Sequence, residues 1–259
     1  LKDHIDISNL ISSLDVKLDT GSIFGITRFK LLIPETRRGD NEVFSANLLK
    51  HLKFLSPRTF YVESSINRNK THKFIFQEKI SKEMLEHNGF REGPIIESNE
   101  KYIWNTTEDP FFRDDKKLTG DPLIFARIIN EEWANRSFEN KIIATEAVER
   151  FNKSLFATLN DRQVNNEILS EDTTFIYMFE AANRALIANH GVATNHNRQF
   201  FYDRLSNTFI PIYYDGNPEF FKNKPRQDFK YANSKKLAEA AMKEKDIKIN
   251  NEDLLTELK

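Results

Sequence analysis

The feature that most constrains the fold is a change of hydrophobic period near residue 80. Before it, short β-branched and aromatic runs bounded by turn residues predict strands, in the order strand, helix, strand, strand. After it, apolar residues recur at helical spacing over most of the chain. We therefore predict an α+β protein of two lobes, a small β-rich α/β lobe at residues 1–80 and a larger, mainly helical lobe at 81–259. A β-hairpin at 199–215 is expected as an insertion in the second lobe.

The first lobe is predicted from four segments. "SIFGITRFKLLIP" (22–34) predicts a strand or tight hairpin, on which Arg28 and Lys30 share one face because side chains alternate along a strand. "ETRRGDNE" follows as a polar turn. The remaining segments predict a helix, "NEVFSANLLKHLKFL" (41–55), and an antiparallel hairpin, "RTFYVESSI" (58–66) with "HKFIFQEKI" (72–80).

The second lobe is predicted to begin with a short helix between Ser81 as N-cap and Gly89 as its C-terminal stop. The acidic, Pro- and Gly-containing span 91–120 is expected to be irregular. Helical spacing predicts further helices at 121–137, 140–159 and 171–191, and a charged helix near the end in "SKKLAEAAMKEK" after the basic region "FKNKPRQDFK". Buried strands are predicted for "RQFFYD" (198–203) and "TFIPIYYD" (208–215).

Composition narrows the function classes. The 38 basic and 39 acidic residues are interspersed and give a formal charge of −1, so no nucleic-acid partner is expected. The absence of cysteine excludes a thiolate nucleophile, a disulfide framework and cysteine-ligated zinc. No apolar run approaches the roughly 20 residues that a bilayer span requires, so we expect no membrane span in this fragment. The start at Leu1 and the end within a helical pattern indicate a fragment or a processed form.

The densest polar chemistry lies in "NHNRQFFYDRLSNTFIPIYYDGNPEFF" (195–221), around the predicted hairpin. Asp215 follows a buried strand and opens an Asp-Gly-Asn turn, so it is either an Asx-type cap of that turn or a magnesium ligand. His190, Asn195, His196 and Asn197 could hold a metal, donate to phosphate or satisfy loop carbonyls. A zinc site is disfavoured, because the two histidines lack compact ligand spacing.

The first lobe supplies the candidate cations. Lys30 and Arg28 could grip a phosphate, or could be solubilising charges on an exposed strand face. Glu42, at the start of the predicted helix, could pair with the strand cation, or could favour the helix dipole. The joining segment near residues 77–80 and the loops near 190 and 215 are expected to line a cleft between the lobes.

These motifs resemble those of the CotH-type (spore-coat protein H) atypical kinases. "HNRQFFYDRLSNTFIPIYYDGNP" looks like the late family motif, in which a His-Asn pair leads into an aromatic strand, a turn and a strand ending in a metal-binding Asp. "RFKLLIPETR" resembles the family's cation-bearing strand, and "HKFIFQEKISKEMLE" its strand into the inter-lobe segment. The resemblance covers roughly residues 20–220.

The resemblance implies a protein-kinase-like fold that transfers a phosphoryl group from ATP with magnesium to a protein or glycan acceptor. Lys30, with Arg28 in reserve, would hold the ATP phosphates, and Glu42 would be its partner. Glu78 would lie at the hinge beside the adenine. The metal would be bound by Asn197 and Asp215, because bridging cations neutralise charge on the transferred group.

The chain also departs from the kinase pattern. There is no His-Arg-Asp triplet, and Val192 stands where an Asp would accept the hydroxyl proton, so His190 or Asp203 would have to substitute. A pseudokinase that only binds nucleotide is the corresponding alternative. Two other classes stay open: a noncatalytic binding module, and a metal-dependent phosphodiesterase or nuclease that uses His190, His196, Asp203 and Asp215.

Overall fold

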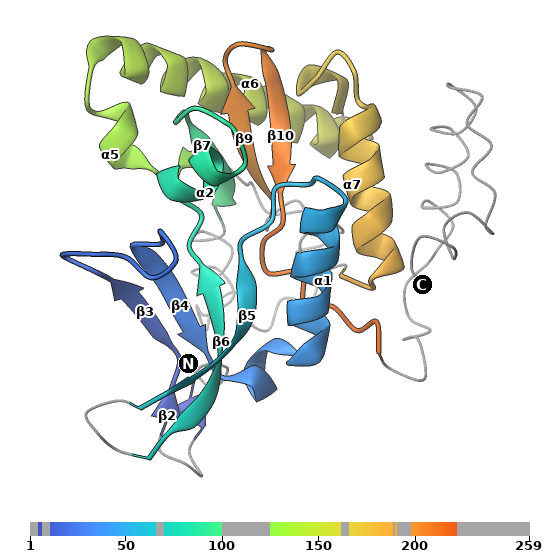
Figure 1. Ribbon diagram of the computed structural model, residues 1–259. Coiled ribbons are helices and arrows are strands. Elements are labelled where there is room, and N and C mark those ends of the chain that lie inside the picture. Colours follow the sequence, from blue (N-terminus) through green and yellow to red (C-terminus); the bar gives the residue numbers. More distant parts are fainter. Residues whose placement is uncertain are drawn as a thin grey trace, which may run out of the picture.

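The computed structural model describes residues 5–6, 11–65, 70–99, 125–161, 166–188, 190 and 198–221 (Figure 1). Within them the chain is an α+β protein with two four-stranded antiparallel sheets and several helices. The strand order is β3-β4-β6-β5 in the first sheet and β10-β9-β7-β8 in the second. Two short strands, β1 (Ile5–Asp6) and β2 (Ile11–Ser12), form a separate antiparallel pair.

The first sheet places the predicted cations on one face. Its strands are β3 (Leu14–Lys17), β4 (Arg28–Leu32), β5 (Thr59–Ser64) and β6 (His72–Glu78). Along β4, Phe29 and Leu31 are buried, whereas Arg28 and Lys30 are partly exposed. The period of two therefore confirms the predicted shared face of the two cations. The predicted hairpin is also confirmed as β5 and β6, which pair antiparallel.

A helix packs beside this sheet (Figure 1). It is α1 (Asp40–His51), which follows the short 3₁₀ helix η2 (Pro34–Arg37), and it confirms the helix predicted from 41–55. Its buried face carries Glu42, Ser45, Ala46 and Leu49. The helix ends earlier than predicted because Lys53 adopts a positive φ of 67°, which an α-helix cannot continue.

The second sheet contains the predicted hairpin and two strands that were not predicted. The hairpin is confirmed as β9 (Gln199–Asp203) and β10 (Thr208–Ile212). The irregular segment predicted at 91–120 is wrong where β7 (Ile95–Asn99) runs, and the helix predicted at 121–137 is wrong where β8 (Phe125–Ile128) runs. β7 pairs with both β9 and β8, so strand pairing with distant segments outweighs the local helical period. Only the short α5 (Glu131–Ala134) remains of that predicted helix.

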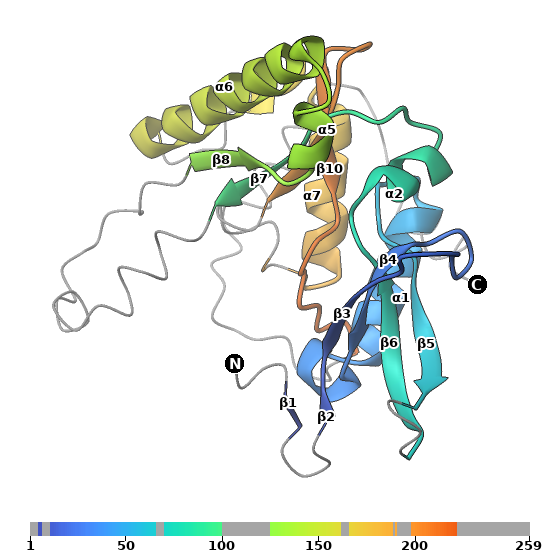
Figure 2. The same cartoon turned by 90° about the vertical axis from the view of Figure 1, so that its left-hand side faces the viewer.

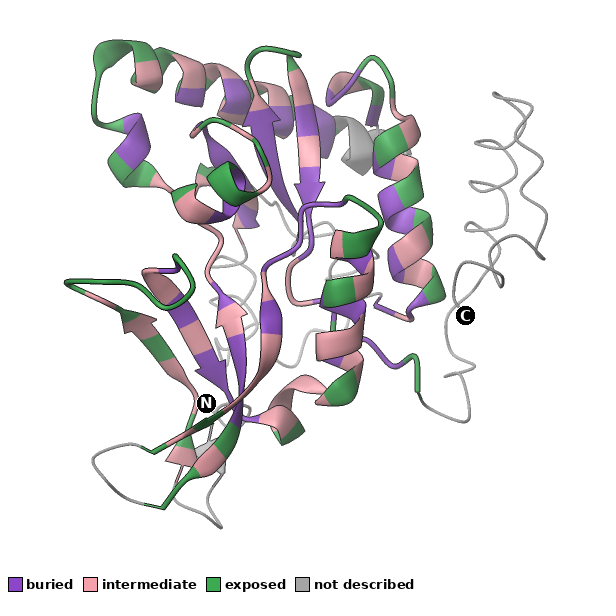
Figure 3. Cartoon of the chain, viewed as in Figure 1, coloured by how far each residue is buried: buried purple, intermediate pink, exposed green. Residues whose placement is uncertain are grey.

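The helices of the second half cover the second sheet (Figures 1 and 2). They are α2 (Lys82–His87), α6 (Phe138–Asp161), the 3₁₀ helix η3 (Asn166–Ile168) and α7 (Thr174–Ala185), and α2, α6 and α7 were predicted. Phe151 of α6 packs on Phe200 and Phe209 of the hairpin, with ring centroids 5.3 and 5.8 Å apart. Figure 3 shows β9 almost entirely buried, as the sequence indicated.

The connection between α1 and β5 packs against the second sheet. The backbone N–H of Tyr213 donates to the carbonyl of Leu55 at 2.8 Å, and Leu55 and Ile212 form a parallel bridge. Leu55 and Ile212 also share a buried cluster with Met84 and Leu85 of α2. The segment after β10 is therefore anchored against the chain that leads from α1 to β5. The predicted basic region and charged helix after residue 221 lie outside the described residues.

Candidate functional site

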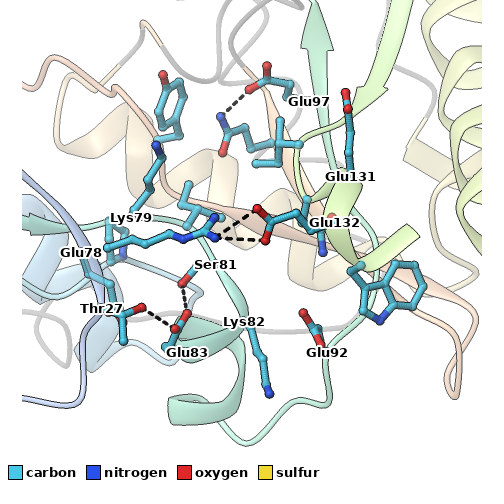
Figure 4. Close-up of a pocket in the computed structure, with 18 of the residues that line it drawn as sticks. Thr27, Glu78, Lys79, Ser81, Lys82, Glu83, Glu92, Glu97, Glu131 and Glu132 are labelled. Atoms are coloured by element: carbon cyan, nitrogen blue, oxygen red, sulfur yellow. Dashed lines mark hydrogen bonds and ion pairs between the residues drawn. The ribbon is translucent and has the colours of Figure 1, made fainter. Parts of the chain in front are cut away.

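A cleft of about 740 Å³ lies between the two sheets (Figure 4). Residues of β3, β4 and β6 line one side, and residues of β7, β8, α5 and β9 line the other. Pockets that hold small molecules in proteins typically measure about 300–1,000 Å³. The cleft is therefore large enough for a ligand of nucleotide size.

Both signs of charge line each side of this cleft. The first-sheet side carries lysines and Arg28 together with Glu78 and Glu83 (Figure 4). On the opposite side, Glu97 and Glu92 pair with Arg127 and Arg136. One ion pair spans the gap, because the guanidinium of Arg28 donates to the Glu132 carboxylate at 3.0 Å. Arg28, predicted as the reserve phosphate-binding cation, would have to leave Glu132 to take that role.

Lys30 differs from Arg28 because its ammonium group makes no hydrogen bond or ion pair with the described residues. It projects from β4 opposite Gln77 on one side and Asp15 on the other, and lies 5.7 Å from the Tyr214 ring centroid. Burial lowers the pKa of Lys30, and the like charge of Arg37 lowers it further. A half-buried cation that lines a cleft without an ion pair is suited to an anionic ligand.

Asp215 lies three residues beyond the end of β10, in the Asp-Gly-Asn turn. Its φ is 45°, in the left-handed region that Asp and Asn adopt in turns more readily than most residues. Arg37 of η2 forms an ion pair with carboxylate oxygen Oδ1, and His190 Nδ1 lies 3.3 Å from Oδ2. Burial acts to raise the pKa of Asp215, but the hydrogen bond with His190 and the charges of Arg37 and Lys30 together lower it. The carboxylate is therefore held ionised at this point.

Lys30 and Asp215 lie close enough for each charge to influence the other's pKa. The structure thus brings together the strand cation of the first half and the carboxylate of the rear hairpin, and it places His190 beside them.

Glu42 lies behind these groups and is almost fully buried. Its carboxylate accepts hydrogen bonds from the Tyr213 hydroxyl at 2.9 Å and from the Gln77 amide at 3.0 Å. Burial raises the pKa of Glu42 to about 7. No direct pair joins Glu42 to Lys30 among the described residues; Gln77, which donates to Glu42, is the cross-strand neighbour of Lys30.

Glu78 occupies the end of β6, where the chain leaves the first sheet, and it lines the cleft. Its side chain is 1% exposed, and it accepts hydrogen bonds from the Arg58 guanidinium at 2.6 and 2.9 Å. The carboxylate is thus used by Arg58. If the segment after β6 contacts an adenine base, groups other than the Glu78 carboxylate would make that contact.

The remaining predicted site residues do not join this group in the described part of the chain. Asp203 lies at the opposite end of the β9–β10 hairpin from Asp215, where its carboxylate accepts hydrogen bonds from Leu205 N at 3.1 Å and Ser206 Oγ at 2.6 Å. Its position is that of a turn cap. His196 and Asn197 lie outside the described residues.

Sequence analysis missed three residues of the site: Arg37, Gln77 and Tyr213. Arg37 was part of a segment taken as a polar turn, although it stands between the cation-bearing strand and the helix that carries Glu42. Tyr213 was counted only as a strand residue, although it directly precedes the Tyr-Asp pair at the strand end. The sequence signal that could have identified them is their position: each is a polar residue within a few positions of a predicted site residue.

The fold and the cleft define the class of protein: an α+β protein with a charged, ligand-sized cleft between two antiparallel sheets. No protein-family model matches the chain, and no curated protein matches it. In the described part of the chain, no helix combines the length and apolarity needed to cross a membrane. Function must therefore be inferred from the chemistry of the cleft.

Proposed function

We propose that the protein is an ATP- and magnesium-dependent phosphotransferase of the CotH kinase-like type, whose acceptor is a protein or a glycan. Its first sheet with α1 would form the small lobe and the remainder the large lobe, with the nucleotide in the cleft. The observation that carries the proposal is the Lys30 ammonium, half-buried in this cleft near Asp215 and without an ion pair among the described residues. A nucleotide phosphate would supply the missing anion.

Each part of the nucleotide is assigned to a residue or segment of the cleft. Lys30 would hold the phosphates, and the segment from Glu78 onward would face the base. Asp215, with Asn197, would bind magnesium, which supplies neutralisation of the charge that develops on the transferred phosphoryl group. Magnesium is commonly held by one or two carboxylates together with substrate phosphates and water. Asp215, three residues beyond β10, would supply one carboxylate, whose oxygens face Arg37 and His190 in this structure.

His190 is the favoured candidate for the group that accepts the acceptor hydroxyl's proton. Its ring nitrogen lies 3.0 Å from the Asp215 carbonyl oxygen and 3.3 Å from the carboxylate, so it stands at the proposed metal site. Asp203, the other candidate, is used in the β9–β10 turn. A pseudokinase-type module would use the same cleft and bind nucleotide without transferring phosphate.

The phosphodiesterase or nuclease alternative receives less support. It requires Asp203 to meet Asp215, and the two lie at opposite ends of the hairpin. Among the described residues, no cluster of three or more His, Asp or Glu side chains is arranged to hold a metal ion, and this bears equally on the magnesium proposed at Asp215.

Nucleotide binding tests the proposal directly. Magnesium-ATP at 100 times its dissociation constant should stabilise the wild-type protein by about 2.7 kcal/mol in thermal unfolding. Lys30→Met should weaken binding by about 1.5–3 kcal/mol, the range for a hydrogen bond to a charged group. Lys79→Met is the matched control, because Lys79 also lines the cleft but is paired with Asp15 at 2.8 Å.

A measurement of phosphoryl transfer distinguishes an active enzyme from a pseudokinase. Release of ADP that depends on magnesium and on His190 would support catalysis. Binding without ADP release would support the noncatalytic module, and absence of any nucleotide effect would reject both.

A further inference from the structure

Gln199 brings a buried, unpartnered hydrogen-bond acceptor to the wall of the cleft. It is the first residue of β9, it is 4% exposed, and it lines the cleft on the side of the second sheet. Its Nε2 donates to Glu97 Oε2 at 2.8 Å, whereas its Oε1 makes no hydrogen bond with any of the described residues. The two ends of the amide cannot be exchanged, because a carboxylate oxygen needs a donor opposite it. The bond to Glu97 therefore leaves the carbonyl oxygen unmatched, which is costly for a buried group.

Glu97 adds acceptor capacity beside this oxygen. It belongs to β7, is the cross-strand neighbour of Gln199, and lines the same cleft (Figure 4). Arg127 of β8 forms an ion pair with Glu97 Oε1, so Arg127 and Gln199 use one site on each carboxylate oxygen. A carboxylate offers about four acceptor sites. Glu97 and Gln199 thus form two adjacent groups that can accept further hydrogen bonds.

The charge of this pair favours a neutral donor over an ion. Arg127 offsets the negative charge of Glu97, and the Gln199 amide carries no charge. A ligand cation would gain less from a carboxylate that is already in an ion pair, and a phosphate would meet acceptor oxygens. Neighbouring hydroxyl groups suit the pair, because each can donate a hydrogen bond without bringing charge. Carboxylates bind the ribose hydroxyl of dinucleotides in the same way.

Lys30 supplies the opposite chemistry in a neighbouring part of the cleft. Gln199 is the cross-strand neighbour of Ile212, and the ring of Tyr214, two residues further on, has its centroid 5.7 Å from Lys30 Nζ. A nucleotide matches both chemistries, since it joins an anionic phosphate chain directly to a neutral ribose diol. Phosphates at Lys30 would therefore bring the ribose toward the acceptor pair.

We propose that Gln199 and Glu97 bind the ribose hydroxyls of the nucleotide, one hydroxyl donating to Gln199 Oε1 and the other to the Glu97 carboxylate. Because Oε1 is buried, a small rotation of the terminal amide, whose last torsion is soft, accompanies binding. The pair then determines specificity for ribonucleotides over deoxyribonucleotides. The inference rests on the proposed function in placing a nucleotide in the cleft, and goes further in naming the residues that recognise its sugar.

Glu92 provides a matched control for Glu97. Both carboxylates line the cleft, both form an ion pair with an arginine, and their side chains are 15% and 14% exposed, respectively. Of the two, only Glu97 is bonded to Gln199. A difference between Glu97→Gln and Glu92→Gln therefore reports on the proposed ribose site and not on the loss of one charge from the cleft.

The test is calorimetric titration of magnesium-ATP and of its 2′-deoxy and 3′-deoxy analogues into the full chain. Wild type should prefer ATP by about 2- to 12-fold over the analogue that lacks the hydroxyl on the neutral Gln199 amide. The preference should be about 12- to 150-fold over the analogue that lacks the hydroxyl on the Glu97 carboxylate. Gln199→Met should abolish the smaller preference, Glu97→Gln should reduce the larger one, and Glu92→Gln should keep both.

Three results would overturn the inference alone. They are equal binding of ATP and both analogues by wild type, survival of both preferences in Gln199→Met, and an equal loss in Glu92→Gln and Glu97→Gln. The wild-type comparison needs no variant, and thermal melts show which variants are folded. If wild type binds no nucleotide at all, the proposed function fails and this inference fails with it.

Discussion

Replacing Glu42 by Gln should change the pH dependence of stability in a direction that the site dictates. The Glu42 carboxyl is buried between Tyr213 and Gln77, and burial raises its pKa from 4.5 to about 7. The folded protein favours the protonated Glu42 carboxyl. The contribution of Glu42 to the free energy of unfolding is therefore fully present below pH 4.5 and is lost as the pH rises through 7. Gln carries no charge and should not show this loss.

The magnitude follows from the two pKa values. At about 1.36 kcal/mol per pH unit, the full difference corresponds to about 3 kcal/mol, of which about 2.5 kcal/mol falls between pH 5 and pH 8. Wild-type Glu42 should therefore lose about that much unfolding free energy relative to Glu42→Gln over this range. Other titrating groups are common to both proteins and cancel in the comparison.

Urea unfolding of both proteins at pH 5, 6, 7 and 8 measures this difference. The gap in unfolding free energy should grow in favour of Glu42→Gln from pH 5 to pH 7 and level off toward pH 8. A gap that is independent of pH would show that Glu42 titrates near its ordinary value. A gap that grows in the opposite direction would mean that an ion pair stabilises the carboxylate, and the description of this site would be wrong.

Two further changes test the surroundings of the cleft. Arg58→Met leaves the buried Glu78 carboxylate without its partner and should cost about 3–5 kcal/mol in urea unfolding, whereas loss of an exposed helix pair by Lys82→Met should cost under about 0.5 kcal/mol. Equal effects of the two would refute the importance of the buried pair. Gly216→Ala places a Cβ 2.5 Å from Cε2 of the Tyr213 ring, so the ring must shift away from its hydrogen bond to Glu42. Its melting temperature should fall, and an unchanged value would contradict the packing described.

Local patterns predicted the elements whose partners are close in sequence. Alternation along β4 gave the shared face of Arg28 and Lys30, and the β5–β6 and β9–β10 hairpins followed from paired short strands. β7 and β8 were missed because their stability comes from pairing with each other and with β9 across long stretches of chain. In β8 the apolar residues also fit a helical period, which only the sheet overrides.

The candidate site, like the fold, was predicted only in part from the sequence. Lys30 and Asp215 stood out as a strand cation and a carboxylate at a strand end, and the structure brings their charges within mutual influence. The expected Lys30–Glu42 pair is replaced by hydrogen bonds through Gln77 and Tyr213, which no spacing rule reveals. Arg37 was hidden because a short 3₁₀ helix and a polar turn have the same composition.

The most direct test of the central claim is calorimetric titration of magnesium-ATP into wild type, Lys30→Met and Asp215→Asn. We predict saturable binding to wild type, weaker binding to Lys30→Met, and binding to Asp215→Asn that no longer depends on magnesium. Binding that is absent from wild type, or that is unchanged in both variants, would contradict the assignment of this cleft to a nucleotide.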